Sequence, residues 1–493
     1  MNLATAMVNE SRKKLTENGA TAYSSTGSAM LDLFGCIGSL RSREESDICR
    51  LFVEAYKENP LLATKCLFYC RDVRGGLGER RTFRVIMRYC AQHHPEAILP
   101  NIKLVGDYGR YDDLYDLVGT QLESEMWAVM THQLHLDTVN MKRKKTISLL
   151  AKWIKTPDAS SSNTRRLGIA TAQAMGLTVY DFKRKLRAMR KYLDVVERHM
   201  SANEWSEIQY PAVPSRAMMI YRNAFKRHDE TRYDNFLNAV ANGDASINAS
   251  TLFPYDIVEK YERQYCSDED ATLEAQWKAL PNYLDRPANA IVIADTSGSM
   301  TRANARPLYS SLALAIYFAE RNTGAYHNLW MSFSHKPTIH RLQGETLIQK
   351  LRSIERAFWH NETNLELAFR RILDIAIQNH VPAEEMVKSL IIVSDMEIDE
   401  AQSGYAWSFY DSMRKLYMDN GYIIPNIVFW NVFSRNDTFL ADKSRVGVQL
   451  CSGQSASTFK VLMKSVGMNP VEMMTNTLMA ERYAPVTVRG IEC

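Results

Sequence analysis

The stretch Ala290-Ile-Val-Ile-Ala-Asp-Thr-Ser-Gly-Ser-Met300 decides how the C-terminal part of this 493-residue chain is expected to fold. Its first five residues are apolar, and such a short run is typical of a strand that is buried on both faces. A carboxylate, Asp295, and two hydroxyls, Ser297 and Ser299, follow almost directly. Because ligands bind beyond the carboxyl ends of parallel strands, the stretch predicts a binding site at the end of this strand.

Apolar runs alternate with helical patterns from Ala288 onward, which predicts an α/β domain over residues 288–493. Continuous apolar strands separated by helices favour a mostly parallel, Rossmann-like sheet with helices on both faces. We expect strands at 290–294, 328–333, 389–394, 426–431 and 446–451, and helices at 306–321, 345–357, 365–379 and 404–418.

The preceding part, residues 1–285, has helical patterns almost throughout and no strand-like alternation. Residues 181–198 show the clearest amphipathic pattern, which predicts one helix with a basic face. Many helices joined by short turns are typical of an all-α solenoid of the HEAT type. The segment 281–287, with a proline at each end, marks the boundary between the two expected domains. Further helices are expected at 45–58, 61–71, 79–93 and 231–241.

Positive charge is concentrated in one segment of the chain. The formal net charge is only +4, yet residues 142–198 contain 15 Lys or Arg and 4 Asp or Glu. An ordinary solvated helix face is the alternative explanation for such a run. The size of the local excess favours contact with a polyanion such as a nucleic acid.

The composition also indicates where the protein works. Eight cysteines in a chain of this length do not form a disulfide scaffold, so we expect reduced thiols. No apolar stretch reaches the roughly 20 residues that a membrane helix needs, and residues 1–14 lack the apolar segment of a secretory signal. These features predict a cytoplasmic protein without a membrane partner, and we expect it to be a monomer.

Two later residues would complete an oxygen-only metal site. Thr363 precedes a helical pattern, and Asp395 directly follows the apolar run 389–394. Magnesium prefers about six oxygen ligands, so the sequence predicts a site for Mg²⁺, or for Mn²⁺ or Ca²⁺. The expected ligands are Asp295, Ser297, Ser299, Thr363 and Asp395.

Three other interpretations of the first motif remain open. The aspartate and the two serines would also cap the helix that follows them. A phosphoryl-transfer site with Asp295 as the nucleophile usually has a second acidic residue two positions later, where this chain has Ser297. A serine hydrolase would require a Gly-x-Ser-x-Gly context, which neither serine has. We therefore expect no catalytic residues and no enzymatic activity.

The order Asp-x-Ser-x-Ser, then a threonine, then an aspartate at a strand end resembles the metal-ion-dependent adhesion site of von Willebrand factor A domains. This resemblance implies that Ser297, Ser299 and Thr363 contact the ion, while Asp295 and Asp395 act mainly through water. It also implies a sixth position that is open to a partner's carboxylate or phosphate. The chain departs from the family pattern because Thr363 lacks a preceding glycine and Met396 stands where many members have glycine.

A helical solenoid followed by such a domain resembles the architecture of the Ro 60 kDa autoantigen, or TROVE-module, proteins. Three segments look closer to a Ro-like family of uncharacterised proteins, DUF2828: residues 71–80, 109–114 and 447–453. The Ro resemblance implies a ring closed by the metal domain, with single-stranded RNA in the hole and structured RNA on the basic outer face. It thereby implies a ribonucleoprotein role with small noncoding or misfolded RNA.

The expected RNA-binding residues come from two regions. One is the turn around residues 71–84, where Gly75, Gly76 and Gly78 would let backbone amides approach a phosphate. Ion pairs of its arginines with Asp72 and Glu79 are the alternative, and Asp112 and Asp113 are alternatively helix caps. The other region is the basic segment 142–198. The full set is Arg71, Arg74, Arg80, Arg81, Arg84, Lys142, Arg143, Lys144, Lys145, Arg165, Arg166, Lys183, Arg184, Arg187, Arg190 and Lys191.

Aromatic residues such as Trp153, Tyr180, Tyr192 and Tyr221 would stack on unpaired bases or, in the simpler interpretation, pack the core or grooves. The sequence thus favours a non-enzymatic RNA-binding scaffold with a divalent-metal site. The alternative function is a protein-interaction module without an RNA role, in which the metal binds a partner's carboxylate.

Overall fold

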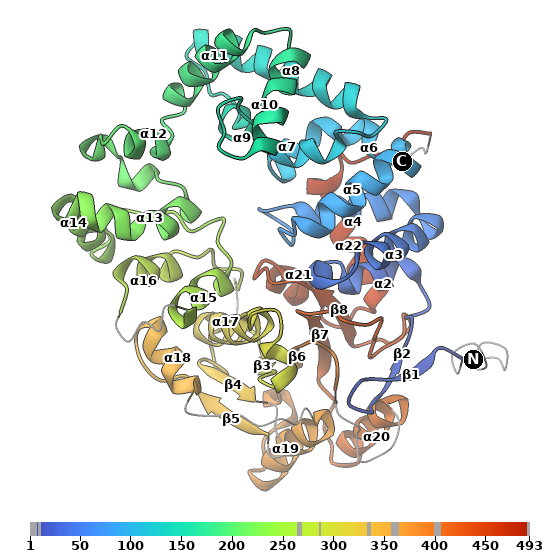
Figure 1. The fold of residues 1–493 in the computed structure, drawn as a ribbon. Coiled ribbons are helices and arrows are strands. Elements are labelled where there is room, and N and C mark those ends of the chain that lie inside the picture. The colour runs from blue at the N-terminus through green and yellow to red at the C-terminus, as the bar shows by residue number, and fades with distance from the viewer. Residues whose placement is uncertain are drawn as a thin grey trace.

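The computed structural model describes residues 7, 11–263, 269–284, 287–332, 337–355, 364–398 and 406–490. Apart from a short hairpin, the described chain up to Lys278 is helical, and a six-stranded sheet with helices follows (Figure 1). The prediction of a mostly helical N-terminal part and an α/β C-terminal part is therefore confirmed. Within the described ranges, no helix combines the length and apolar character needed to cross a membrane.

The first part contains fifteen α-helices among its described residues, most of them short and joined by tight turns. They are α2 (Ala29–Cys36), α3 (Glu45–Glu58), α4 (Pro60–Arg71), α5 (Arg81–His93), α6 (Pro95–Ile98), α7 (Val105–Tyr108), α8 (Glu123–Lys142), α9 (Leu150–Trp153), α10 (Ser162–Ala174), α11 (Val179–Tyr192), α12 (Val196–Ser201), α13 (Ser215–His228), α14 (Glu230–Ala241), α15 (Pro254–Arg263) and α16 (Ala271–Lys278). Between α7 and α8 lies a 3-10 helix, η3 (Tyr111–Leu117).

Local sequence explains several of these helix ends. Asn59 caps α4 by accepting a hydrogen bond from the Leu62 amide at 2.9 Å, and Pro60 occupies the first helical position. The helices predicted at 45–58 and 231–241 match α3 and α14 to within one residue. The single helix predicted at 181–198 is wrong, because the chain breaks between α11 and α12 at Asp194, which has a left-handed φ of 49°. The apolar stripe nevertheless packs inward, since Phe182, Leu186 and Met189 are buried.

The sheet has the strand order β5-β4-β3-β6-β7-β8. Its strands are β3 (Ala290–Ala294), β4 (Leu329–Ser332), β5 (Thr338–Arg341), β6 (Ser389–Ser394), β7 (Asn426–Asn431) and β8 (Val448–Ser452). All neighbours pair in parallel except β4 and β5. Counted from β3, the order is that of a doubly wound sheet, 3-2-1-4-5-6, so the connections reverse direction between β3 and β6.

Helices cover this sheet, as the sequence predicts. They are α17 (Arg306–Arg321), α18 (Leu347–Glu355), α19 (Leu365–Gln378), α20 (Ala406–Asp419), α21 (Thr458–Lys464) and α22 (Pro470–Leu478). The long helix α17 packs against β3, β4 and β6, and twelve of its sixteen residues are buried. The parts of the expected elements at residues 333, 356–357 and 404–405 lie outside the described residues.

Two features formed by strands were not predicted from the sequence. The edge strand β5 is absent from the predicted set, and its residues are only partly buried or exposed. Near the N-terminus, β1 (Lys13–Leu15) and β2 (Thr21–Tyr23) form an antiparallel hairpin in a region predicted to be helical. Tyr23 of this hairpin also forms an isolated antiparallel bridge with Phe439, so the hairpin is attached to the C-terminal part.

The chain follows a closed path around a central space (Figure 1). On one side, α2 packs on β8 and α22 packs on α4. On the other side, α15 packs on α17, and the Trp277 indole donates a hydrogen bond to Glu320 at 2.9 Å. Both ends of the helical part therefore contact the sheet part.

A buried carboxylate fastens the first of these junctions. Asp72, at the end of α4, is fully buried and accepts two hydrogen bonds from the Arg482 guanidinium, both 2.7 Å long. The Tyr483 hydroxyl donates to the same carboxylate at 3.1 Å, and Lys65 donates to the Tyr483 carbonyl at 2.6 Å. The segment after α22 is thus held against the α4–α5 turn by charge-assisted hydrogen bonds.

We predict that Asp72→Ala loosens this junction, because Arg482 and Tyr483 lose their shared acceptor. Hydrogen bonds to charged groups contribute about 1.5 to 3 kcal/mol, so amide exchange in residues 470–489 should accelerate roughly tenfold or more. Hydrogen–deuterium exchange with mass spectrometry measures this effect. Exchange in α14, which lies elsewhere in the fold, provides the internal control, and unchanged protection of residues 470–489 would contradict the prediction.

Candidate functional site

Asp295 and Asp395 lie at the carboxyl ends of the adjacent strands β3 and β6, where the sheet order reverses. The Asp295 carboxylate accepts hydrogen bonds from the Ser297 amide at 2.9 Å and from the Ser394 hydroxyl at 2.6 Å. The Ser297 and Ser299 hydroxyl oxygens lie 3.1 Å apart in the turn that follows. Four of the five predicted ligands are therefore placed by one sheet edge, whereas Thr363 lies outside the described residues.

Burial makes Asp295 an unusual carboxylate. It is fully buried, and burial together with the nearby Asp395 charge raises its pKa to about 6. The hydrogen bonds that it accepts come from a neutral hydroxyl and a backbone amide. A hard divalent cation is the group that such an oxygen-only set fits, because it would compensate the two carboxylates. Among the described residues, no cluster of three or more His, Cys, Asp or Glu side chains offers another metal site.

Arg435 already compensates one of these carboxylates. Its Nη2 atom lies 2.9 Å from Asp395 Oδ2, and its Nη1 atom pairs with Glu17, which lies in the β1–β2 turn. The Glu17 amide donates to Glu397 at 2.7 Å, and the Thr16 hydroxyl donates to the Ile398 carbonyl at 2.7 Å. The N-terminal hairpin is thus attached to the edge of the sheet that holds the predicted metal ligands. No local signal in the sequence identifies Arg435 as part of this site.

The backbone beyond the two serines is strained. Ala303, Asn304 and Ala305 all have left-handed φ values, of 50°, 59° and 58°. For alanine this conformation costs roughly 1 to 2 kcal/mol per residue, whereas asparagine adopts it more readily. Such strain gathers at functional sites when the surrounding structure holds it in place.

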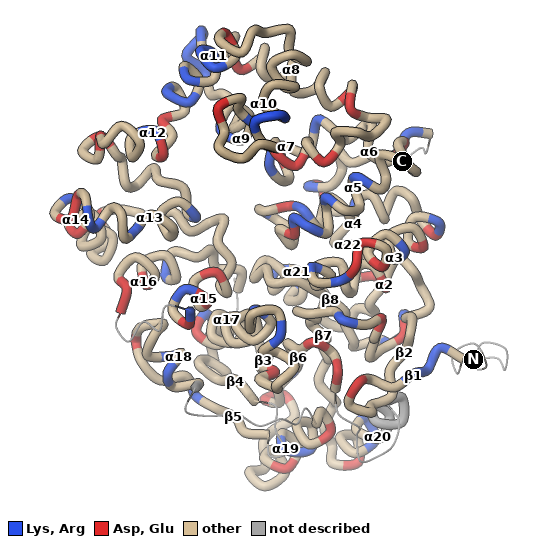
Figure 2. The backbone as a smooth tube through the Cα atoms, in the orientation of Figure 1, with Lys and Arg blue, Asp and Glu red and all other residues tan. Residues whose placement is uncertain are grey.

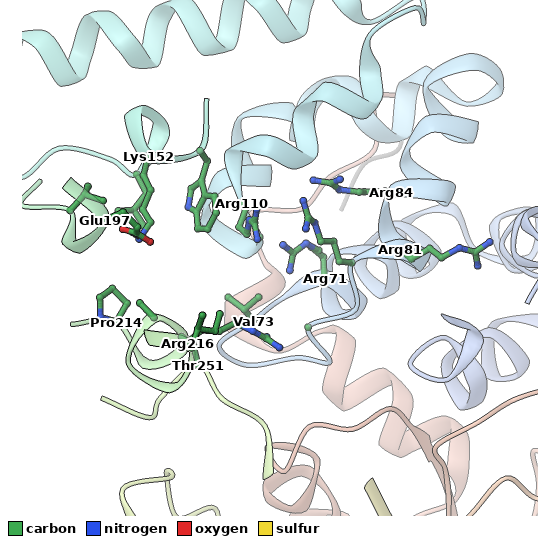
Figure 3. Close-up of a pocket in the computed structure, with 18 of the residues that line it drawn as sticks. Arg71, Val73, Arg81, Arg84, Arg110, Lys152, Glu197, Pro214, Arg216 and Thr251 are labelled. Atoms are coloured by element: carbon green, nitrogen blue, oxygen red, sulfur yellow. Dashed lines mark ion pairs between the residues drawn. The ribbon is translucent and has the colours of Figure 1, made fainter. Parts of the chain in front are cut away.

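A basic cavity of about 1540 Å³ occupies the centre of the closed path. Fifteen Arg or Lys side chains line it, against four Asp or Glu side chains. Figure 2 shows several basic segments of the backbone beside the central space, and Figure 3 shows side chains from several helices that line the cavity. The lining cations are Arg41, Arg71, Arg74, Arg80, Arg81, Arg84, Arg88, Arg110, Lys152, Lys183, Arg187, Arg190, Arg198, Arg216 and Arg306.

Half of the predicted RNA-binding residues line this cavity. They are Arg71, Arg74, Arg80, Arg81, Arg84, Lys183, Arg187 and Arg190. The other half are exposed on α8, α10 and α11 and in the turn after α8, and they do not line the cavity: Lys142, Arg143, Lys144, Lys145, Arg165, Arg166, Arg184 and Lys191. The basic segment 142–198 thus contributes both to the cavity and to the outer surface.

Seven lining cations were missed by the sequence analysis. They are Arg41, Arg88, Arg110, Lys152, Arg198, Arg216 and Arg306. Most of these residues stand outside the dense basic segment, and Arg306 belongs to the first turn of α17 in the sheet part. Closure of the chain brings all seven to one surface, so for the five that lie outside residues 142–198 no local charge pattern would have revealed them.

Two buried aspartates hold four of these arginines in place. Asp113 is fully buried and pairs with the buried Arg71 at 2.8 Å and with Arg84 at 2.6 Å. Asp112 pairs with Arg80 and Arg110, each at 2.6 Å. Burial alone would raise the pKa of Asp113, but the charges of Arg71 and Arg84 outweigh it and lower the pKa.

The structure shows which of the alternative roles, helix capping or ion pairing, the acidic residues of this region have. Asp113 also accepts a hydrogen bond from the Arg110 amide at 3.0 Å, so it caps η3 as well as pairing with arginines. Asp72 and Glu79 do form ion pairs, but with Arg482 and Arg41. The Gly75 and Gly78 amides donate to Asp72, so they are occupied within the turn.

The fold and these two sites define a class: a multidomain protein with a helical part and an α/β part, in which side chains mainly of the helical part line a basic cavity. The chain belongs to the family described as a domain of unknown function, DUF2828, which matches residues 16–146 and 169–287. The predicted likeness to that family is confirmed. A second family, also described as a domain of unknown function (DUF7788), matches residues 289–486.

A viral protein is similar over most of the chain. The "Uncharacterized protein L728" of Acanthamoeba polyphaga mimivirus is 29% identical over 516 residues, which covers 96% of this chain and 89% of that protein. The similarity therefore spans both the helical part and the sheet part.

We predict that Asp113→Ala destabilises the helical part, because it leaves the buried Arg71 charge without its partner. Breaking a buried ion pair costs about 3 to 5 kcal/mol of the free energy of unfolding. Urea denaturation followed by far-ultraviolet circular dichroism measures the loss. Glu345→Ala, at an exposed position, serves as the control.

The pH dependence of this loss has a defined sign. The lowered pKa of Asp113 means that its charge contributes stability above the ordinary carboxyl pKa of about 3.9. That contribution disappears as the pH falls through the lower pKa of the folded state. The difference between wild type and Asp113→Ala should therefore shrink in acid, and a constant difference would contradict this assignment.

Proposed function

We propose that this protein is a non-enzymatic, RNA-binding scaffold of the Ro-like type, which takes single-stranded RNA into its central cavity. The observation that carries the proposal is the convergence of fifteen cationic side chains, from both parts of the chain, on one cavity. Cations that neutralise phosphates release condensed counterions, and this effect supplies most of the affinity for nucleic acid.

The size and the charge of the cavity support a polymeric anion. Its volume of about 1540 Å³ is larger than the roughly 300 to 1,000 Å³ of pockets for small molecules. Several cations remain available beyond the buried pairs. The Arg187 side chain is exposed and has no hydrogen bond or ion pair with any described residue. The exposed Arg74 side chain donates a hydrogen bond to the Asp107 carbonyl and has no other side-chain partner among the described residues.

The architecture that we propose has two domains. Residues 1–285 form a HEAT-like, TROVE-like solenoid, and residues 288–493 form a von Willebrand factor A-like domain that closes the ring. The doubly wound strand order with an antiparallel third strand supports the second assignment. Structured RNA would bind the outer basic surface, where Lys144, Arg165 and Lys191 are exposed.

The second candidate function is a metal-dependent protein-interaction module. The observation that favours it is the pair of hydroxyls beside two strand-end carboxylates, none of which lines the basic cavity. Asp295, Ser297, Ser299, Asp395 and Thr363 would hold Mg²⁺, Mn²⁺ or Ca²⁺. Such an ion would supply an open coordination position for a carboxylate of a partner.

We predict salt-dependent binding of a single-stranded RNA of about ten nucleotides. For each phosphate contact, the logarithm of the affinity should fall by ~0.7 per tenfold increase in salt concentration. Arg187→Glu should weaken binding roughly tenfold and flatten the salt dependence, because it replaces a free cation in the cavity with an anion. Fluorescence anisotropy between about 50 and 200 mM salt measures both effects.

The matched control for this experiment is Arg371→Glu. Arg371 is exposed on α19 and does not line the cavity, so the same charge change there should leave the affinity almost unaltered. Absence of RNA binding by the wild type even at the lowest salt would refute the proposed function.

We also predict that Arg435→Gln strengthens divalent-cation binding, because it removes the guanidinium that occupies Asp395. A gain of roughly tenfold, about 1.4 kcal/mol, is expected. Titration with Mn²⁺ followed by electron paramagnetic resonance measures it, and Ser297→Ala should reduce the affinity instead. If the wild type and both variants show no saturable Mn²⁺ binding, the proposed assignment of a metal site is wrong.

A further inference from the structure

One arginine in the cavity wall is stacked on a tryptophan. The Arg110 guanidinium carbon lies 3.6 Å from the centre of the Trp153 ring. Arg110 lies between α7 and η3, and Trp153 is the last residue of α9, so the fold brings together residues 43 positions apart. Both residues line the cavity and are partly exposed, and Figure 3 shows Arg110 at the centre of the group of lining side chains.

The plane of this guanidinium is fixed from its edge. Arg110 Nε donates to Asp112 Oδ1 at 2.8 Å, and Arg110 Nη2 donates to Asp112 Oδ2 at 2.6 Å. This bidentate arrangement uses the in-plane donors and holds the group flat. One face of the guanidinium is covered by the indole of Trp153. The Arg110 side chain is 31% exposed and lines the cavity, so this fixed guanidinium is accessible to a ligand there.

We propose that Arg110 and Trp153 form a stacking subsite for one unpaired nucleobase of the bound strand. This inference rests on the proposed function, and it adds that the cavity recognises bases and not only phosphates. Arginine planes and aromatic rings both stack on nucleobases, and such stacking tolerates any base because every base has a π face. The subsite therefore selects unpaired bases without selecting a sequence.

Neighbouring cations are placed to bind the phosphates beside that base. Arg80 donates to the same Asp112 oxygen as Arg110, at 2.6 Å, so the two guanidinium groups are adjacent. Lys152 Nζ lies 5.6 Å from the centre of the Trp153 ring. A base on the Arg110 plane would thus have the Arg80 and Lys152 cations nearby, and such cations bind the phosphates that flank a base in a single strand.

A purely structural stack makes a different prediction. If Arg110 and Trp153 only packed the wall, ligand affinity would depend on charge alone, and a strand without bases would bind as well as one with bases. The subsite instead requires that removal of the bases weakens binding while the charge stays the same.

The test compares two probes of equal length and charge, a single-stranded oligoadenylate RNA and an abasic ribose-phosphate oligomer. Wild-type protein should bind the oligoadenylate roughly tenfold more tightly. Arg110→Lys keeps the charge but removes the planar surface, so it should abolish most of this preference. Arg216→Lys, another lining arginine paired with an aspartate, is the matched control and should keep the preference.

The outcomes separate this inference from the function on which it rests. Equal affinity of the wild type for both probes overturns the stacking subsite but leaves RNA binding intact. Failure to bind either probe overturns both. A preference that Arg110→Lys retains also overturns the subsite.

A second measurement does not depend on a folded variant. Single-stranded RNA that contains 4-thiouridine is irradiated in complex with the wild-type protein, and the cross-linked peptides are identified by mass spectrometry. Cross-links within residues 108–112 or 150–154 support the subsite. Cross-links confined to other segments overturn it.

Discussion

The buried pair of Asp112 and Asp113 is the constraint on which the central cavity depends. Cationic side chains that crowd one surface repel each other, and four of them, Arg71, Arg80, Arg84 and Arg110, lie against these two carboxylates. Because Asp113 and Arg71 are both buried, solvent screens their attraction little, whereas Arg80 and Arg110 pair with the buried Asp112 from partly exposed positions. The aspartates therefore permit a strongly basic wall within a folded protein and also fix the direction of each guanidinium.

This arrangement separates two roles among the arginines. Arg71 is buried in the cavity wall and has a structural role. Arg74 and Arg187 are exposed, line the cavity and form no ion pair with a described residue. Arg110 belongs to both groups, since its edge is held by Asp112 and its face is stacked in the cavity. Arginines therefore have two roles in this cavity: some stabilise its wall, and others are accessible to a ligand.

Much of the fold was predictable from local sequence, and the exceptions have physical causes. The apolar runs at 290–294, 389–394 and 426–431 became the predicted strands, because strands buried on both faces need continuous apolar residues. The break at Asp194 and the hairpin at 13–23 lack such a signal. Asp295 and Asp395 were predictable as partners because parallel strands end at the same sheet edge. Arg435 and Arg306 were not, since closure of the chain decides their neighbours.

Closure of the path also has a consequence for the order in which the protein folds. Asp72 takes its strongest partners from Arg482 and Tyr483, which follow it by 410 and 411 positions. At ribosomal rates of about 5 to 20 residues per second, roughly 20 to 80 s separate the synthesis of these partners. During that interval the α4–α5 turn contains a carboxylate that awaits its counter-ion, so nascent chains would expose this region for far longer than α13 or α14, whose contacts are local.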